Sequence, residues 1–156
     1  MEKGRKVFLS YHKANDSEVK KLIDELAKKG CVVKTRTTRS AGDQELEDSQ
    51  FNQILSEDLQ WAEIVFVLIS EGSSSDESCL NEEIEEAHRY DKTIIGVFMS
   101  GATDQDVPET LNNVGRGLIP NDIERITMAI ENKDVGWNDV AGKPRQKVKT
   151  IKKDEC

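Results

Sequence analysis

Residues 63–98 have the sequence EIVFVLISEGSSSDESCLNEEIEEAHRYDKTIIGVF, and this stretch decides the fold. Its two apolar runs, at 64–69 and 93–98, are rich in β-branched residues and predict strands that are buried on both faces. A loop of small polar residues follows the first run, and a helix is predicted from about Ser78 to Tyr90. Together these elements predict one right-handed βαβ unit.

Glu83 in the predicted helix is the candidate functional side chain. The apolar positions Leu80, Ile84 and Ala87 form a stripe that faces the core, and Glu83 lies beside this stripe. Ligands of open α/β sheets bind where strands end and helices begin, so a carboxylate at this place can face a crevice. The alternative is a wholly solvated acidic face, which would also include Glu82, Glu85 and Glu86. Position alone leaves both interpretations open.

The rest of the chain continues the alternation of strands and helices. Apolar runs predict three more strands, at residues 6–11, 31–33 and 118–119. Apolar residues at helical spacing predict helices at residues 16–29, 51–61 and 123–130, with a turn or short helix starting at Pro108. Polar segments predict loops at residues 35–48, 100–106 and 112–117. Five strands alternating with helices predict an α/β fold, a flavodoxin-like doubly wound parallel sheet with helices on both faces.

Length and composition indicate a single domain in the cytoplasm. A chain of 156 residues can bury a core of its own, and no apolar run reaches the roughly 20 residues of a membrane helix. The N-terminus leads into a strand without an apolar signal segment. The three cysteines are widely spaced and match neither a disulfide framework nor a zinc pattern. We expect a domain at residues 1–135 and a flexible basic tail at residues 136–156.

The charge of the chain is acidic and unevenly distributed. The formal net charge is 22 − 30 = −8, which argues against general nucleic-acid binding. Residues 141–156 nevertheless carry six Lys and Arg side chains against two acidic ones. We interpret this segment as a solvated tail, and the alternative is a contact to a partner or to RNA.

Two common kinds of site are not indicated by the sequence. His12 and His88 are distant from each other and lack a Cys/His cluster, so we expect no metal site. No G-x-G-x-x-G or Walker motif is present, which excludes the ordinary dinucleotide and nucleoside-triphosphate sites. Cys79 is a candidate nucleophile with a partner histidine, although a cysteine at a helix start more often has a structural role.

Five segments, in the right order, resemble the motifs of TIR domains. They are the first strand at 7–11, the second strand with its loop at 30–33 and 41–42, the third strand at 61–70, the helix start at 78–84, and residues 92–97 with 107–108. The last segment is most similar to the bacterial TIR-like branch that includes the Thoeris antiphage proteins. The resemblance covers roughly residues 6–130.

The resemblance implies an enzyme of prokaryotic defence that breaks the nicotinamide–ribose bond of NAD, as a hydrolase or a cyclase. It implies that Glu83 is the catalytic glutamate, because this register places Ile84 and Ala87 in core positions, whereas Glu82 in that role would place Glu83 and Glu86 there. NAD is then the substrate, no cofactor is expected, and the partners are like domains and a downstream effector protein. The implied substrate-binding residues are Ser10, His12, Lys13, Ser70, Gly72 and Cys79.

The sequence departs from the family pattern at two places, and two alternative functions stay open. Cys79 stands where the family often has Trp, which removes an aromatic surface for stacking. Residues 34–36 replace the usual hydrophobic-hydrophobic-Asp ending of the second strand. One alternative is a non-catalytic TIR-like module that associates through residues 35–48. The other is a nucleoside deoxyribosyltransferase, a class that shares this architecture and uses a glutamate nucleophile.

Overall fold

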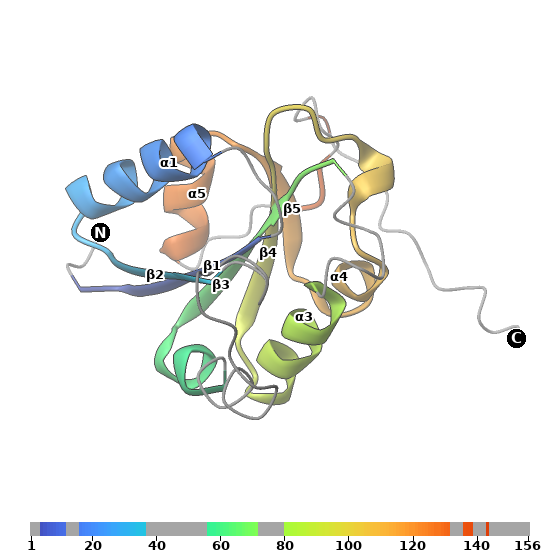
Figure 1. Ribbon diagram of the computed structural model, residues 1–156, viewed down its shortest axis with the longest axis horizontal. Helices are drawn as coiled ribbons and strands as arrows, with labels where there is room; N and C mark the ends of the chain where they lie inside the picture. The colour runs from blue at the N-terminus through green and yellow to red at the C-terminus, as the bar shows by residue number, and fades with distance from the viewer. Residues whose placement is uncertain are drawn as a thin grey trace, which may run out of the picture.

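The protein is built on a five-stranded parallel sheet with helices on both faces (Figure 1). The computed structural model describes residues 4–11, 16–36, 56–71, 80–131, 136–138 and 143. The strands are β1 (Lys6–Tyr11), β2 (Val32–Arg36), β3 (Ile64–Ile69), β4 (Thr93–Phe98) and β5 (Gly117–Pro120). Their order is β2-β1-β3-β4-β5, the flavodoxin-like order, which confirms the predicted fold class.

The helices form two layers, one on each face of the sheet. The described helices are α1 (Asp16–Lys28), α3 (Leu80–Arg89), α4 (Glu109–Val114) and α5 (Ile123–Ile130), with a 3-10 helix at Asp104–Asp106 and a helical segment at residues 56–61. In Figure 1, α1 and α5 lie together on one face, and α3 and α4 lie on the other. None of the helices in the described ranges is long and apolar enough to cross a bilayer.

The central strands contribute side chains to both layers. In β1, Val7 and Leu9 pack into the apolar cluster on the α1/α5 face, whereas Phe8 packs into the cluster on the α3/α4 face. β3 lies between β1 and β4, and all of its residues are buried, as its continuous apolar run predicts. Gly96 of β4 allows close packing on the α3/α4 face, because a Cβ there would lie 2.6 Å from Leu111 Cδ2.

The prediction of a loop over residues 112–117 is wrong at both ends. Helix α4 continues to Val114, and β5 begins at Gly117. The only fully buried side chain of α4 is Leu111, so the segment has almost no apolar periodicity, and its two asparagines favour turns. Tertiary packing of Leu111 forms the helix, and the Gly115 amide closes it with a 2.8 Å hydrogen bond to the Leu111 carbonyl.

Two other elements differ from expectation in smaller ways. β2 runs to Arg36, three residues beyond the predicted end, because its backbone stays paired with β1 up to Ser10. The predicted loop at 100–106 ends in the 3-10 helix, where Thr103 and Asp106 cap each other in a capping box. Sequence periodicity detects neither, because backbone pairing and capping need no apolar pattern.

A segment from beyond α5 covers the β5 edge of the sheet. The Leu118 amide donates to the Gly136 carbonyl at 3.1 Å, and the Leu118 carbonyl accepts from Asn138 N at 3.0 Å and from Asn138 Nδ2 at 2.9 Å. Trp137 packs against the apolar cluster on the α3/α4 face. Residues 136–138, the start of the predicted tail, thus pack onto the sheet. The predicted division into a domain and a flexible tail stays a prediction beyond them, since residues 139–142 and 144–156 lie outside the described residues.

Candidate functional site

Glu83 in the first turns of α3 points into the protein. It is 2% exposed, and its Oε1 accepts a hydrogen bond from the hydroxyl of Ser10, which is 1% exposed and belongs to β1. Burying a carboxylate is unfavourable unless hydrogen bonds compensate it, and an apolar side chain would avoid that penalty. Such groups concentrate at functional sites, so the burial of Glu83 marks this place as a candidate site.

Strand alternation explains why Ser10 meets α3. Phe8 faces the α3/α4 layer, and Ser10, two residues further along β1, has the same orientation at the carboxyl end of the strand. Ser10 is aligned with Val67 of β3 and with Arg36 of β2, so it lies on an interior strand of the sheet. The chain leaves β1 toward β2 and leaves β3 toward β4, which makes the β1/β3 edge the topological switch point where ligands bind.

The first turn of α3 is also fixed to α4. Asn81 Oδ1 accepts the backbone N–H of Thr110 at 3.2 Å. Pro108 is the N-cap of α4 and makes no side-chain capping bond, so Asn81 supplies the acceptor that this helix start needs. Glu83 follows Asn81 by two residues, so the contact to α4 helps to fix its backbone, while the Ser10 hydroxyl holds its side-chain carboxylate.

The other glutamates of α3 form its solvated face. Glu82 and Glu85 are exposed, and Glu86 pairs with Arg89 on the surface at 2.6 Å. An exposed pair of this kind contributes little to stability. The interpretation of a wholly solvated acidic face therefore holds for these residues and fails for Glu83.

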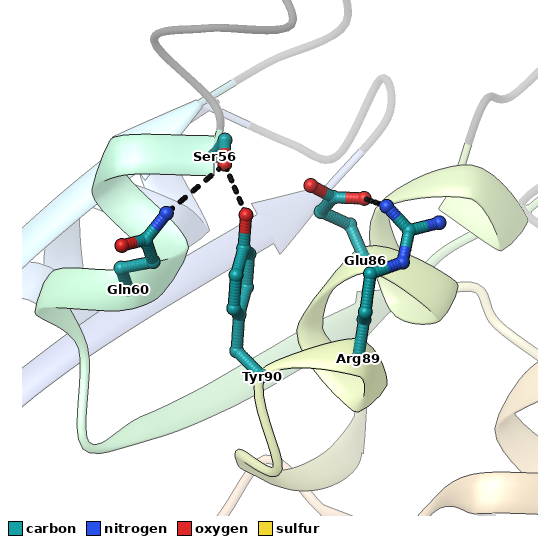
Figure 2. A network of polar contacts seen from close by, with 5 residues as sticks. All are labelled: Ser56, Gln60, Glu86, Arg89 and Tyr90. Atoms are coloured by element: carbon teal, nitrogen blue, oxygen red, sulfur yellow. Dashed lines mark hydrogen bonds and ion pairs between the residues drawn. The ribbon is translucent and has the colours of Figure 1, made fainter.

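The C-terminal end of α3 is anchored to the helical segment at residues 56–61 (Figure 2). The hydroxyls of Tyr90 and Ser56 lie 2.5 Å apart, and Gln60 Nε2 donates to Ser56 Oγ at 3.3 Å. Lys92 Nζ adds a bond to the Gln60 carbonyl at 3.0 Å. With Asn81 at the other end, α3 is held at both termini, which gives the Glu83 backbone a defined position.

The remaining sequence-predicted site residues are placed only in part. Ser70 directly follows β3 at the same sheet edge and is buried. His12, Lys13, Gly72 and Cys79 lie outside the described residues. The structure thus brings Ser10 and Glu83 together, and it places Ser70 at the end of the neighbouring strand. In the part of the chain that is described, no group of three or more His, Cys, Asp or Glu residues gathers to hold a metal.

The family model for the Thoeris protein ThsB, TIR-like domain, matches residues 8–104, which is more than half of the chain. The chain belongs to this family. The matched range begins within β1 and contains β3, α3 and β4, so it includes both Ser10 and Glu83. The TIR-like assignment predicted from the sequence motifs is confirmed.

Two solved structures are similar to this TIR-like domain. A 2-deoxyribosyltransferase from Bacillus psychrosaccharolyticus has a TM-score of 0.54 at 16% identity, covering 90% of this chain and 99% of that one. The TIR domains of the activated Roq1 resistosome, which directly recognises the pathogen effector XopQ, give a TM-score of 0.45 at 20% identity, covering 61% of this chain and 57% of that one. At 16% identity, the similarity to the 2-deoxyribosyltransferase indicates a common fold alone. No protein with a curated description matches the chain.

The TIR-like domain has a second carboxylate at the same sheet edge, on the opposite face. Both Glu18 oxygens, in the first turn of α1, accept from the Ser100 amide at 3.1 Å, and Oε2 also accepts from Ser100 Oγ at 3.2 Å and Asn121 Nδ2 at 3.0 Å. These contacts tie α1 to the ends of β4 and β5. They border an open depression of about 680 Å³ between α1 and the start of α5.

Sequence reasoning misses the hydrogen bonds from Ser100 and Asn121 to Glu18, which together form a clamp. A glutamate in a first helical turn is expected to interact with the helix dipole, and Glu18 fits that pattern. Its partners follow β4 and β5 and are 82 and 103 residues away, so no local signal identifies them. The Asn81–Thr110 contact also joins distant residues, so no local pattern predicts it. One indication is Pro108, which has no side chain that can cap α4, so the helix needs an acceptor from elsewhere.

Proposed function

We propose that this TIR-like domain cleaves the bond between nicotinamide and ribose in NAD, as a cytoplasmic enzyme of antiphage defence. The observation that supports this function is Glu83, a buried carboxylate hydrogen-bonded by Ser10 at the carboxyl edge of the sheet. Membership of the Thoeris TIR-like family gives the defence context. No cofactor is needed, because NAD is the substrate.

The chemistry needs one well-placed carboxylate. Nicotinamide leaves as a neutral molecule and takes the electron pair of its bond to ribose C1′, so the leaving group needs little acid assistance. The ribose gains oxocarbenium character, as in glycoside hydrolysis, and the negative charge of Glu83 beneath the sugar stabilises it. An oxygen then bonds to C1′ and releases a proton. Water as the acceptor gives ADP-ribose, and an oxygen or nitrogen of the same nucleotide gives a cyclic product.

The other predicted site residues have roles in binding. In this proposal His12 and Lys13, which follow β1 in the sequence, bind the pyrophosphate. Ser70, Gly72 and Cys79, which come between β3 and α3 in the sequence, are proposed to bind the rest of the dinucleotide. Assembly with like domains completes the site, and a downstream effector protein receives the product. Activity is then expected to depend on protein concentration and on a trigger from infection.

Nucleoside deoxyribosyl transfer is the second candidate, favoured by the similarity in fold to a 2-deoxyribosyltransferase over nearly the whole chain. The two reactions share the central event, which is breakage of a bond between a sugar C1′ and a base nitrogen. They differ in the acceptor and in the sugar. A glutamate nucleophile that forms a covalent sugar intermediate would serve the second reaction.

One experiment separates the candidates. The purified protein is incubated with NAD, and separately with a deoxynucleoside and a second free base, over a wide range of protein concentrations and with lysate of phage-infected cells. Mass spectrometry identifies the products. Release of nicotinamide with ADP-ribose or a cyclic isomer supports the proposal. A new deoxynucleoside supports the second candidate. Intact NAD under every condition would overturn the proposed activity and leave a TIR-like interaction module.

A further inference from the structure

We infer that Ser10 is a positioning residue that orients the Glu83 carboxylate for bond cleavage, rather than a residue that contacts the substrate. The inference rests on the proposed function and assigns a specific task to one residue of that site. It starts from the direct contact between the Ser10 hydroxyl and Glu83 Oε1, which joins β1 to α3 across 73 residues of sequence.

The Ser10 hydroxyl has little capacity for a substrate contact. A serine hydroxyl has one proton and two acceptor lone pairs, and here the proton is donated to Glu83. The Ser10 side chain is also 1% exposed, so its remaining lone pairs are enclosed by the fold. A carboxylate offers about four acceptor positions, and the bond from Ser10 occupies one of them. The bond from Ser10 thus engages Oε1 and sets the orientation of the Glu83 carboxylate.

The backbone of Ser10 has a fixed position, so its hydroxyl can hold the Glu83 carboxylate in one place. Ser10 is aligned with residues of β2 and β3, and the backbone of β1 is paired on both sides. Phe8 and Val67 on the same face of the sheet are buried and apolar, and a hydrogen bond is stronger in such surroundings than in water. A glutamate has three rotatable side-chain bonds, and the bond from Ser10 restricts the orientation of its carboxylate.

A purely structural role for the pair is the competing interpretation. Two apolar side chains of similar shape would connect β1 and α3 without burying a carboxylate, at equal or better stability. If the pair is structural, removing its hydrogen bond is expected to lower stability. If the pair positions Glu83, removing the bond is expected to lower turnover. The two roles predict opposite results for the same substitutions.

A matched pair of variants tests the inference. Ser10→Thr and Ser10→Val have nearly the same shape, and only Thr keeps the hydroxyl. We expect Ser10→Val to lower kcat for NAD cleavage roughly 10- to 100-fold with KM changed less than about threefold, and Ser10→Thr to retain most of the rate. Ser10→Ala adds no atoms to the core and tests the hydroxyl even if the larger side chains fit poorly. Thermal unfolding of each variant checks that it is folded.

A double variant separates positioning from substrate contact. If Ser10 acts through Glu83, Ser10→Ala in a Glu83→Gln background changes residual turnover and the dissociation constant for NAD by less than about threefold. Losses that multiply would show an independent substrate contact and overturn the inference. Equal kcat values for Ser10→Val and Ser10→Thr would also overturn it while the proposed function stands. Absence of NAD cleavage by the wild-type protein would instead overturn the proposed function, and this inference with it.

Discussion

Glu83 and Glu18 are two carboxylates at the same edge of one sheet, on opposite faces. Each lies in the first turns of a helix, and each accepts hydrogen bonds from distant parts of the chain. Glu18 is partly exposed, and both of its oxygens join the ends of β4 and β5 to α1. Glu83 is 2% exposed and accepts a hydrogen bond from the hydroxyl of Ser10 in β1.

The comparison shows that glutamates at similar positions in two helices can have different roles. Glu18 bridges three elements near solvent, where its hydrogen bonds add stability. Glu83 is buried, so it makes folding harder than an apolar residue would, and that penalty needs a functional explanation. We therefore expect substitutions at Glu83 to affect mainly turnover, and substitutions at Glu18 to affect mainly the free energy of unfolding.

The largest expected effect is that of Glu83→Gln. The amide keeps an acceptor for Ser10 and nearly the same shape, but it removes the charge that stabilises the developing oxocarbenium ion. We expect nicotinamide release to fall at least about 100-fold. The free energy of unfolding is expected either to increase or to fall by less than about 1 kcal/mol. Product chromatography and urea denaturation measure the two quantities.

Glu82→Gln is the matched control for that substitution. It makes the same chemical change on the same helix, but at an exposed position. We expect its turnover to stay close to that of the wild type. Equal losses in the two variants would mean that the net charge of α3, rather than the buried carboxylate, determines activity.

Glu18→Ala is expected to have the larger effect on stability. It removes the acceptor of the Ser100 amide, the Ser100 hydroxyl and the Asn121 amide together. Because the site is partly solvated, we expect a loss of about 1–2 kcal/mol in urea denaturation, with NAD turnover retained within about threefold. Glu25→Ala, on the same helix and beside the same depression, serves as the control. A Glu18→Ala protein with native stability would show that the clamp adds nothing to folding.

Single donors of the clamp are expected to contribute less. Asn121→Ala removes one donor, and Ser100→Ala removes only the hydroxyl because the Ser100 amide stays in place. We expect losses of about 1 kcal/mol for the former and about 0.5 kcal/mol for the latter in the same denaturation assay. A loss from Ser100→Ala that matched Glu18→Ala would locate the stabilising contact in the hydroxyl alone.

The smallest effect concerns Cys31, in the apolar cluster on the Glu18 face. Burial raises the pKa of its thiol above the ordinary value of 9.0, while nearby Arg5 lowers it. Below the pKa of the unfolded chain both states are protonated, so stability is fully present there. As pH rises further, the unfolded thiol ionises first and the free energy of unfolding falls. We expect Cys31→Ala to show a weaker decline in urea denaturation between about pH 8 and 10, with unchanged turnover.

The sequence predicts the elements better than the contacts between them. The apolar runs of β3 and β4 and the stripe of Ile84 and Ala87 give the βαβ unit and place Glu83 beside the core. Its hydrogen bond to Ser10 spans 73 residues and depends on the sheet register, which no local pattern encodes. The short helix predicted to start at Pro108 is present as α4, but its end is misplaced because packing of Leu111, rather than apolar periodicity, extends it to Val114.

The most direct measurement of the central claim is the rate of nicotinamide release from NAD by Glu83→Gln and Glu18→Gln in the same assay. Both variants replace one carboxylate at the same sheet edge by an amide. If the buried carboxylate stabilises the developing charge, Glu83→Gln releases nicotinamide at least about 100-fold more slowly than Glu18→Gln, and Glu18→Gln stays close to the wild type. Equal rates for the two variants would show that the buried carboxylate has no special part in the cleavage.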